Sequence, residues 1–349
     1  MKHYQGAALA LIAIGVVALY GAALMGPGVQ QQTAAIEWVA LPDVNASASA
    51  PLSDVKPITS AALPDVGMLG LDAVALVEQQ QTNTITVAEL RDRFSAVSFE
   101  LGAVRSGGQA VPRLFAEALP HDFKTLDEVD KLKQTFFRMV LPLTLKVNEE
   151  ILADRHQLLT VQKALTAGRT VSDEQAQWLA ELAERYDASP NDISELVRRV
   201  DAISPALALA QSAEESGWGR SRFAQKGNAL FGQRTWDKGR GIVPQQRGED
   251  GRFEVRAFPS LLDSVRSYAR NLNGHPAYDD FRARRAEMRK RDAALDPYGL
   301  TETLTAYSER REHYVETIQK ILRIDSLEEL EDTRLESHPL ETTQFLSPR

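Results

Sequence analysis

Two adjacent carboxylates are the groups in this sequence best placed to do chemistry. Glu214 and Glu215 come directly before a Ser-Gly-Trp-Gly segment at 216–219. On a helix their side chains would point about 100° apart, so they cannot face the same way. A carboxyl group turned toward an apolar wall such as Trp218 would be poorly solvated. Desolvation and the negative end of the helix dipole both raise its pKa. A carboxylic acid that keeps its proton near neutral pH can act as the general acid of glycoside cleavage.

A helix must carry this pair of glutamates. Ser204 is a good N-cap and Pro205 suits the first helical position, so the sequence predicts a helix that starts here and ends against Gly217. Small residues along it allow close packing by neighbouring helices. Two neighbouring glutamates on a helix more often mark a solvated face, however, and helical periodicity does not decide between the two interpretations.

The other predicted elements are mostly helical. Thr86 begins a segment with capping-box spacing, where ordered structure is expected to start. An amphipathic segment at 126–165 contains Pro142, which predicts a kink or two helices. Further helices are predicted at 173–186 and 192–200.

Strand signals are scarce. Two short alternating runs, at 242–247 and 252–258, flank a Gly-bounded turn at 248–251 and predict a hairpin. The sequence therefore predicts a mainly α fold with a small β-hairpin lobe.

The composition excludes several classes of function. The chain has 349 residues and a formal net charge of -8, which argues against nucleic acid as a partner. It has no cysteine, so disulfides, cysteine zinc sites and thiol catalysis are excluded. The six histidines show no metal-ligand spacing, and there is no phosphate loop or dinucleotide fingerprint. We therefore expect neither a metal nor an organic cofactor, and the oligomeric state stays open.

The N-terminus predicts export. Residues 6–25 are uncharged and rich in Ala, Leu, Ile and Val, and roughly 20 apolar residues span a bilayer. Lys2 would stay in the cytoplasm, so the rest of the chain would face outward. The alternative is a cleaved signal peptide, with small residues such as Ala22 and Gly26 near the cleavage site. The favoured prediction is a periplasmic protein anchored in the inner membrane by residues 6–25.

A longer motif surrounds the glutamate pair. It reads Ala-Gln-Ser-Ala-Glu-Glu-Ser-Gly-Trp-Gly at 210–219, then Ser-Arg-Phe at 221–223 and Asn-Ala-Leu-Phe-Gly at 228–232. These segments resemble the glucosaminidase domain of peptidoglycan hydrolases, and in particular its Bax-type branch. The resemblance extends over about residues 110–325. It implies a lysozyme-like fold, in which helices form one lobe, a small hairpin forms the other, and the glycan lies between them.

The resemblance and the composition together predict five regions. Residues 1–28 would be the membrane anchor or signal sequence. A flexible linker rich in Ala, Ser, Pro, Gln and Thr would occupy 29–85. A helical N-terminal region at 86–170 would precede the glucosaminidase domain at 171–325. The polar stretch at 326–349 would be a disordered tail.

The resemblance also implies roles for individual residues. The catalytic glutamate of the family immediately precedes the Ser-Gly-Trp-Gly turn, and this position is Glu215 here. Tyr268 belongs to the aromatic-rich second half of such domains. The residues implied to bind the sugar chain are Trp218, Asn228, Phe231, Trp236, Tyr278, Tyr307 and Tyr314.

A second catalytic carboxylate is harder to assign. Several relatives carry a glutamate in the first strand of the hairpin, where this chain has no acid between 243 and 247. The remaining candidates are Glu249 and Asp250 in the turn and Glu254 in the second strand. A substrate-assisted route, which uses the acetamido group of the sugar, would need no second carboxylate.

The resemblance thus implies a glycoside hydrolase similar to an endo-β-N-acetylglucosaminidase. Its partner would be peptidoglycan glycan strands, cut at β-1,4 bonds next to N-acetylglucosamine, and it would contact the inner membrane through the N-terminal segment. Two alternatives stay open. Without a second acid the chain could bind or scaffold peptidoglycan without cutting it. A lytic transglycosylase also manages with one acid.

A run of basic residues at 282–291 has two interpretations as well. It could contact an anionic wall polymer, but a solvated helix face is the favoured prediction.

Overall fold

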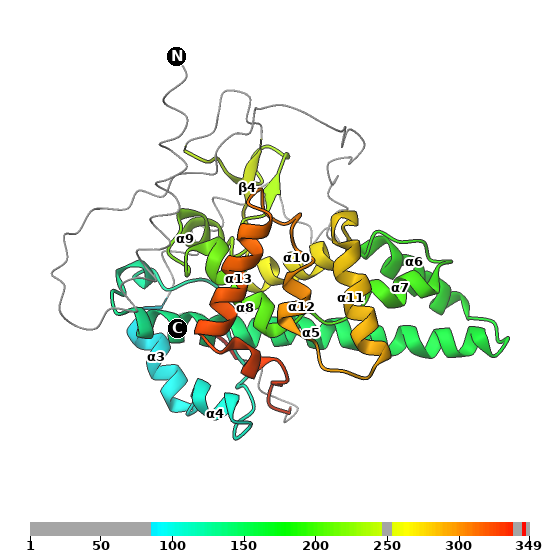
Figure 1. Cartoon of the computed structure of the whole chain (residues 1–349), viewed down its shortest axis with the longest axis horizontal. Coiled ribbons are helices and arrows are strands. Elements are labelled where there is room, and N and C mark those ends of the chain that lie inside the picture. Colours follow the sequence, from blue (N-terminus) through cyan, green and yellow to red (C-terminus); the bar gives the residue numbers. More distant parts are fainter. Residues whose placement is uncertain (1–84, 246–252, 338–343, 347–349) are drawn as a thin grey trace, which may run out of the picture. The chain divides into compact units, whose positions relative to one another are not determined.

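The computed structural model describes residues 85–245, 253–337 and 344–346, and most of these residues are helical (Figure 1). The α-helices are α3 (Val87–Ala96), α4 (Leu101–Arg105), α5 (Val129–Thr166), α6 (Asp173–Arg185), α7 (Ile193–Arg199), α8 (Pro205–Ser216), α9 (Arg222–Gly227), α10 (Leu261–Gly274), α11 (Asp279–Lys290), α12 (Pro297–Thr301) and α13 (Glu312–Ile324). Short 3-10 helices are η1 (Phe123–Thr125), η2 (Pro276–Tyr278) and η3 (Leu327–Leu330). The strands are β1 (Leu114–Ala116), β2 (Arg234–Thr235), β3 (Gly241–Ile242), β4 (Glu254–Arg256) and β5 (Gln344–Leu346). The expected mainly α fold is confirmed.

The expected N-terminal anchor and almost all of the linker, residues 1–84, lie outside the described residues. Within the part of the chain that is described, no helix is both long enough and apolar enough to cross a bilayer.

The helix starts predicted from capping residues are confirmed. The Thr86 hydroxyl accepts from the Glu89 amide at 3.1 Å, and the Glu89 carboxylate accepts from the Thr86 amide at 2.7 Å. At the start of α8 the Ser204 hydroxyl accepts from the Leu207 amide at 3.1 Å. Gly217 ends α8 in the left-handed conformation, with φ 56°, which a residue without a Cβ adopts at little cost.

Helix α5 is the longest element and lies across the lower part of Figure 1. Its 38 residues would extend about 57 Å, and Pro142 does not divide it into two helices. A proline inside a helix removes one backbone hydrogen bond. Here Leu141 and Leu143 on either side are fully buried, so packing of this stretch offsets the loss.

Three short strands form a small antiparallel sheet in the order β2-β4-β3. The predicted hairpin is confirmed for β3 and β4, whereas β2 was not expected, and the turn at 246–252 lies outside the described residues. Gly241 makes the pairing possible, because a Cβ there would lie 2.3 Å from the carbonyl oxygen of Val255.

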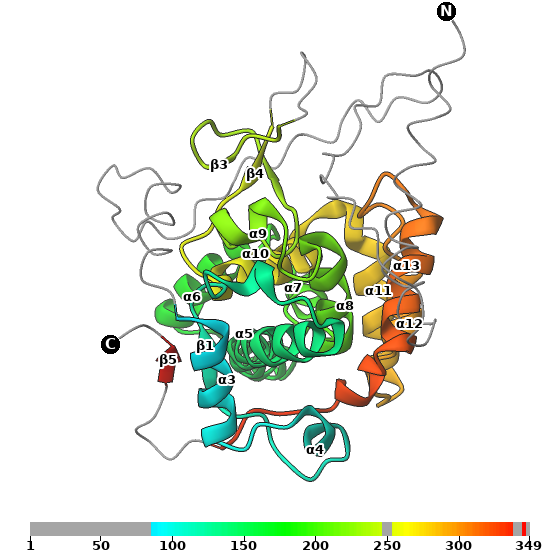
Figure 2. The same cartoon turned by 90° about the vertical axis from the view of Figure 1, so that its left-hand side faces the viewer.

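Helix α8 is enclosed by other helices. It packs against α5 on one side and α13 on another, and Figure 2, viewed nearly along α5, shows α8 beside it. Every residue from Ala206 to Ala213 is fully buried. Its alanines let the neighbouring helices approach closely, which explains why this helix carries so little bulk.

Two polar contacts fix the start of α8. Asn148 of α5 donates to the carbonyl of Ile203 at 2.7 Å and accepts from the Ile203 amide at 2.8 Å. Glu331, just after η3, accepts from the Ser204 hydroxyl at 2.6 Å and from the Ala206 amide at 3.3 Å. Burial raises the pKa of Glu331 to about 7.

The expectation of a disordered tail from residue 326 is wrong for residues 326–337. Leu327 and Leu330 of η3 are fully buried, and Leu335 forms a parallel bridge with Val111. Strand β5 pairs in parallel with β1. The three buried leucines, the backbone bridge to Val111 and the contacts of Glu331 with the start of α8 hold this segment against the helices.

The basic run of α11 is in part the solvated face that was expected, because Arg284, Arg289, Lys290 and Arg291 are exposed. Arg282 and Arg285 are buried, at 1% and 0% exposed. Arg285 donates to the carbonyls of Arg198, Arg199, Asp201 and Ala202, at 3.0 to 3.3 Å, and to the amide oxygen of Asn273 at 2.7 Å. Arginine can be buried when carbonyls satisfy its donors, and composition alone does not reveal this.

The contact between Asn148 and Ile203 generates a stability prediction. Asn148→Ala leaves the amide and carbonyl of Ile203 buried without partners, at about 1–3 kcal/mol each. We expect the free energy of unfolding in urea to fall by about 2–6 kcal/mol. Thr160→Ala, at an exposed position of the same helix, should change it by less than about 0.5 kcal/mol. Equal effects of the two substitutions would contradict this role for Asn148.

Candidate functional site

Glu215 lies in the last turn of α8, where a loop between α9 and β2 comes close to its side chain. Gly232 of this loop has φ +60°, and a Cβ there would lie 3.3 Å from Glu215 Oε2. Any larger residue would therefore be strained by its backbone conformation and crowded against the carboxyl group. The glycine of the Asn-Ala-Leu-Phe-Gly segment thus allows the loop to approach the acid.

Two buried hydrogen bonds hold this loop. Asn228 has φ 51° and ends α9, and its side-chain amide donates to the carbonyl of Phe258 at 3.0 Å. The amide of Leu230 donates to the Ser264 hydroxyl at 3.1 Å. Asn228 is 1% exposed, so its contacts in the described structure are structural.

The surroundings of Glu215 favour its protonated form. Burial is the main cause, and the neighbouring charge of Glu214 acts in the same direction. A hydrogen bond from Tyr314 and the charge of Arg310 act against them. The balance raises the pKa of Glu215 to about 7. At neutral pH the side chain can therefore both hold and release a proton.

Gln211 links two tyrosines beside the acid. It precedes Glu215 by four residues, so the two side chains lie on the same face of α8. Its amide nitrogen donates to the Tyr314 hydroxyl at 2.7 Å, and its amide oxygen accepts from the Tyr268 hydroxyl at 2.7 Å. Because Tyr314 also hydrogen-bonds to Glu215, this fully buried network sets the position of the acid.

Further aromatic rings extend this network. The Tyr307 ring stacks on Tyr314 at a centroid distance of 5.5 Å, and Tyr278 follows at 5.9 Å from Tyr307. Phe231 stacks on Tyr268 at 3.9 Å, and its carbonyl accepts from the Tyr307 hydroxyl at 3.3 Å. Of the residues implied to bind sugar, the structure therefore brings Phe231, Tyr278, Tyr307 and Tyr314 together beside Glu215.

These tyrosines keep their protons. Burial raises the pKa of Tyr278 to about 12 and the pKa values of Tyr268, Tyr307 and Tyr314 well above their usual range. The charge of Glu215 adds to each shift. Their hydroxyls are therefore neutral hydrogen-bond donors throughout the pH range in which Glu215 titrates.

The two tryptophans implied to bind sugar have different surroundings. Trp218, with φ 59°, packs edge-on against Phe136 and Phe137 of α5 at 6.0 and 5.4 Å, and Lys133 lies 4.8 Å above its ring. It joins the turn after Glu215 to α5. Trp236 is 53% exposed, so its ring is open to a ligand.

The carboxylate of Glu254 is occupied by backbone amides. It is 8% exposed and accepts from the amides of Gly239 and Gly241, at 3.1 and 2.9 Å. These contacts shape the turn between β2 and β3. Glu249 and Asp250 lie outside the described residues. Among the residues that are described, no group of three His, Asp or Glu side chains is arranged to hold a metal ion.

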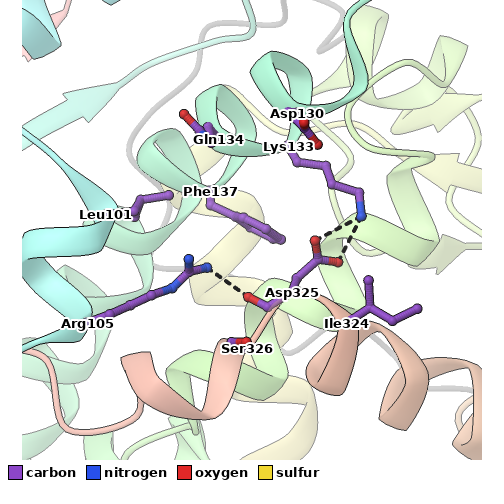
Figure 3. A pocket seen from close by; sticks show the side chains of 9 residues that line it. All are labelled: Leu101, Arg105, Asp130, Lys133, Gln134, Phe137, Ile324, Asp325 and Ser326. Atoms are coloured by element: carbon purple, nitrogen blue, oxygen red, sulfur yellow. Dashed lines mark hydrogen bonds and ion pairs between the residues drawn. The ribbon is translucent and has the colours of Figure 1, made fainter. Parts of the chain in front are cut away.

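A pocket of about 180 Å³ is formed at the ends of α4 and α13 and one face of α5 (Figure 3). Lys133 binds the carboxylate of Asp325 at 2.8 and 3.1 Å, and Arg105 donates to the carbonyl of Asp325 at 2.8 Å. Its lining includes neither Glu215 nor the tyrosines. These contacts fasten the N-terminal region to the end of α13.

Sequence reasoning did not assign four residues around the acid. Gln211 and Gly232 lie within the quoted motif, and the helical spacing of four between Gln211 and Glu215 was a usable signal. Tyr268 was named without a role. Arg310 had no signal, because only the fold brings it to α8.

Comparisons with known proteins match the part of the chain that contains this site. A sequence model of the glucosaminidase family, described as mannosyl-glycoprotein endo-beta-N-acetylglucosaminidase, matches residues 191–326. This range contains Glu215 and the tyrosines around it. Protein bax of Escherichia coli (strain K12) is 33% identical over 188 residues, which cover 52% of this chain and 65% of that protein. The match thus spans slightly less than two thirds of the relative.

No solved structure matches the chain significantly. The motif, the tyrosine-walled glutamate and both matches together make the chain similar to Bax-type glucosaminidase-domain proteins.

Proposed function

We propose that the chain is a peptidoglycan hydrolase that cleaves β-1,4 glycosidic bonds next to N-acetylglucosamine, with Glu215 as the general acid. The glucosaminidase domain supports a glycosidase that acts on peptidoglycan. The observation that carries the assignment is a glutamic acid whose pKa is raised to about 7, within a wall of tyrosines at the end of a buried helix. A helix that only binds glycan has no need of such an acid.

In the proposed reaction, protonated Glu215 donates its proton to the departing glycosidic oxygen as the bond from that oxygen to C1 of the sugar breaks. Positive charge then develops at C1 and the ring oxygen. The Glu215 carboxylate that remains is stabilised by the hydrogen bond from Tyr314. It regains a proton when water completes hydrolysis.

The second half of the reaction needs a nucleophile or a base. The amides of Gly239 and Gly241 occupy the carboxylate of Glu254, which disfavours it in this role. We propose that the acetamido oxygen of the substrate attacks C1, which needs no second carboxylate. Water then attacks C1 and gives its proton to the Glu215 carboxylate. Glu249 and Asp250 remain candidates only for a route that uses two carboxylates.

The aromatic residues would position the glycan. Tyrosine and tryptophan present an apolar face to the sugar ring and a polar tip to its hydroxyls. We assign this role to the exposed Trp236 and the part-exposed Tyr307, with α8 in one lobe and the β2-β4-β3 sheet in the other, as in lysozyme-like folds. In the same proposal, residues 6–25 anchor the protein at the outer face of the inner membrane and the linker lets the domain reach wall strands.

A lytic transglycosylase is the second candidate, since it too works with one acid and the described residues provide no free second carboxylate beside Glu215. It differs in its products. Hydrolysis leaves a reducing end, whereas transglycosylation leaves an internal 1,6-anhydro ring.

Substitution of the acid tests the proposal directly. Glu215→Gln keeps the shape of the side chain but cannot donate a carboxyl proton, so release of fragments from purified peptidoglycan at pH 6 should fall at least about 100-fold. Mass spectrometry of wild-type digests should show N-acetylglucosamine at the reducing ends. Glu316→Gln, on the exposed surface of α13, should digest normally. Full activity of Glu215→Gln would exclude it as the acid, and anhydro products would favour the transglycosylase.

The pH dependence of the reaction follows from the same group. Because the protonated form of Glu215 is the active one and its pKa is about 7, kcat/KM should fall as pH rises through neutrality. The expected slope is about tenfold per pH unit above pH 8. Initial rates on a soluble glycan fragment between pH 5 and 9 measure this limb. A rate that rises with pH above 7 would identify a carboxylate as the essential form instead.

The tryptophans should differ in what they affect. Trp218→Ala removes the contact with α5 and should lower the free energy of unfolding by about 2–4 kcal/mol. Trp236→Ala removes an exposed ring, so stability should change by less than about 0.5 kcal/mol. If Trp236 stacks on sugar, its loss should raise KM about fivefold, as expected for about 1 kcal/mol. An unchanged KM with Trp236→Ala would remove this residue from the proposed binding surface.

A further inference from the structure

Glu214, the carboxylate next to the proposed acid, is paired and mostly buried. Its Oε1 accepts from Arg310 at 2.7 Å, and its side chain is only 12% exposed. Arg310 lies just before α13, far from Glu214 in sequence, and its guanidinium is 5.7 Å from the Tyr314 ring centre. The ion pair therefore lies against the same tyrosine that hydrogen-bonds to Glu215.

Within the described residues, few of the groups around Glu215 carry charge in the relevant pH range. On its own helix α8 the charged neighbour is Glu214, and from the segment before α13 it is Arg310. Tyr314 of α13, Tyr268 of α10, Tyr278 of η2 and Tyr307 also interact with Glu215, but all four stay neutral. Of these groups, one negative and one positive side chain therefore exert an electrostatic effect on Glu215.

The members of the pair act on Glu215 in opposite directions. A negative charge on Glu214 favours the protonated acid, and a positive charge on Arg310 favours its carboxylate. While the two are paired, Arg310 offsets part of the larger effect of Glu214. If either charge is lost, the other acts on Glu215 alone, and the site is partly buried, so solvent screens this interaction less than it would at the surface.

The ion pair also has a structural effect that a neutral residue at position 214 would lack. It ties the segment before α13 to the end of α8. This segment carries Tyr307, whose ring stacks on Tyr314 and whose hydroxyl contacts the loop of Phe231. The same contact thus balances the charge near the acid and holds part of its aromatic wall.

We propose that the Glu214–Arg310 ion pair is a positioning pair that balances the charge around Glu215 and so sets the pH at which the acid loses its proton. This inference rests on the proposed function, because it takes Glu215 as the general acid. It goes beyond that function by giving the second glutamate of the motif a defined role.

The test compares the alkaline limb of kcat/KM in the full chain and three variants. Arg310→Gln leaves Glu214 unpaired, so Glu215 should hold its proton more tightly and the limb should move to higher pH by about half to one unit. Glu214→Gln leaves the positive charge alone, so the limb should move to lower pH by a similar amount. The double variant Glu214→Gln/Arg310→Gln should return close to the wild-type limb, because both charges are gone.

Matched controls separate this role from loss of structure. Arg310→Lys keeps the charge and should restore the wild-type limb. Arg234→Gln removes an arginine from the nearby pair with Glu309, which is more exposed, and should leave the limb in place. If Arg310→Gln does not fold, the downward shift in Glu214→Gln still decides the matter. Lower rates at every pH with an unmoved limb in both single variants would overturn the proposal.

The result for Glu215→Gln separates two kinds of failure. If that variant is inactive and the limb does not move in the Glu214 and Arg310 variants, only the role of the pair is wrong. If Glu215→Gln remains active, the proposed function fails and the limb belongs to another group.

Discussion

The burial of α8 is the constraint on which the site depends. A helix that is enclosed along almost its full length needs small side chains, and the alanines between Ala206 and Ala213 meet this need. The helix can then pass through the middle of the surrounding helices and deliver one carboxyl group at its end. Glu215 is desolvated because the helix that carries it is buried, and desolvation gives the acid its raised pKa.

This arrangement has a cost in stability that depends on pH. The pKa of Glu215 is about 7 in the folded chain, whereas an unfolded glutamate titrates at about 4.3. The folded state therefore binds this proton more tightly. The stability that results is fully present below pH 4.3 and is lost as pH rises through 7. Glu331, at the opposite end of α8, has the same raised pKa and adds to this loss. Ionisation of the carboxyl group at either end of the helix thus lowers the stability of the fold. For Glu215 the cause is the same burial that raises its pKa to about 7.

Local signals in the sequence predicted the elements well. Capping residues located the starts of α3 and α8, because a cap acts over three or four residues of sequence. Whether Pro142 would leave one helix or two, and whether Arg285 would be buried, could not be decided in this way. Both depend on neighbours that come from distant parts of the chain, such as the carbonyls of residues 198–202.

The site shows the same division. The motif singled out Glu215, and helical spacing would have placed Gln211 on its face. No local pattern predicted that Trp218 would pack on α5, or that the Glu254 carboxylate would accept from the amides of Gly239 and Gly241. The type of an aromatic or acidic residue in a motif does not reveal whether its side chain faces a substrate or the protein interior. Only its contacts distinguish the two.

The family match begins at residue 191, yet the residues that hold α8 are not confined to it. Asn148 of α5 fixes the start of the helix, and Phe136 and Phe137 of α5 pack against Trp218 just beyond its end. Glu331, after the matched range, completes the contacts at the start. The acid can be poorly solvated and still have a fixed direction only if both ends of its helix are held. In this chain α5 contributes to both. The helical region before residue 191 is therefore part of what positions Glu215, and the matched domain alone would lack one wall of the helix that carries the acid.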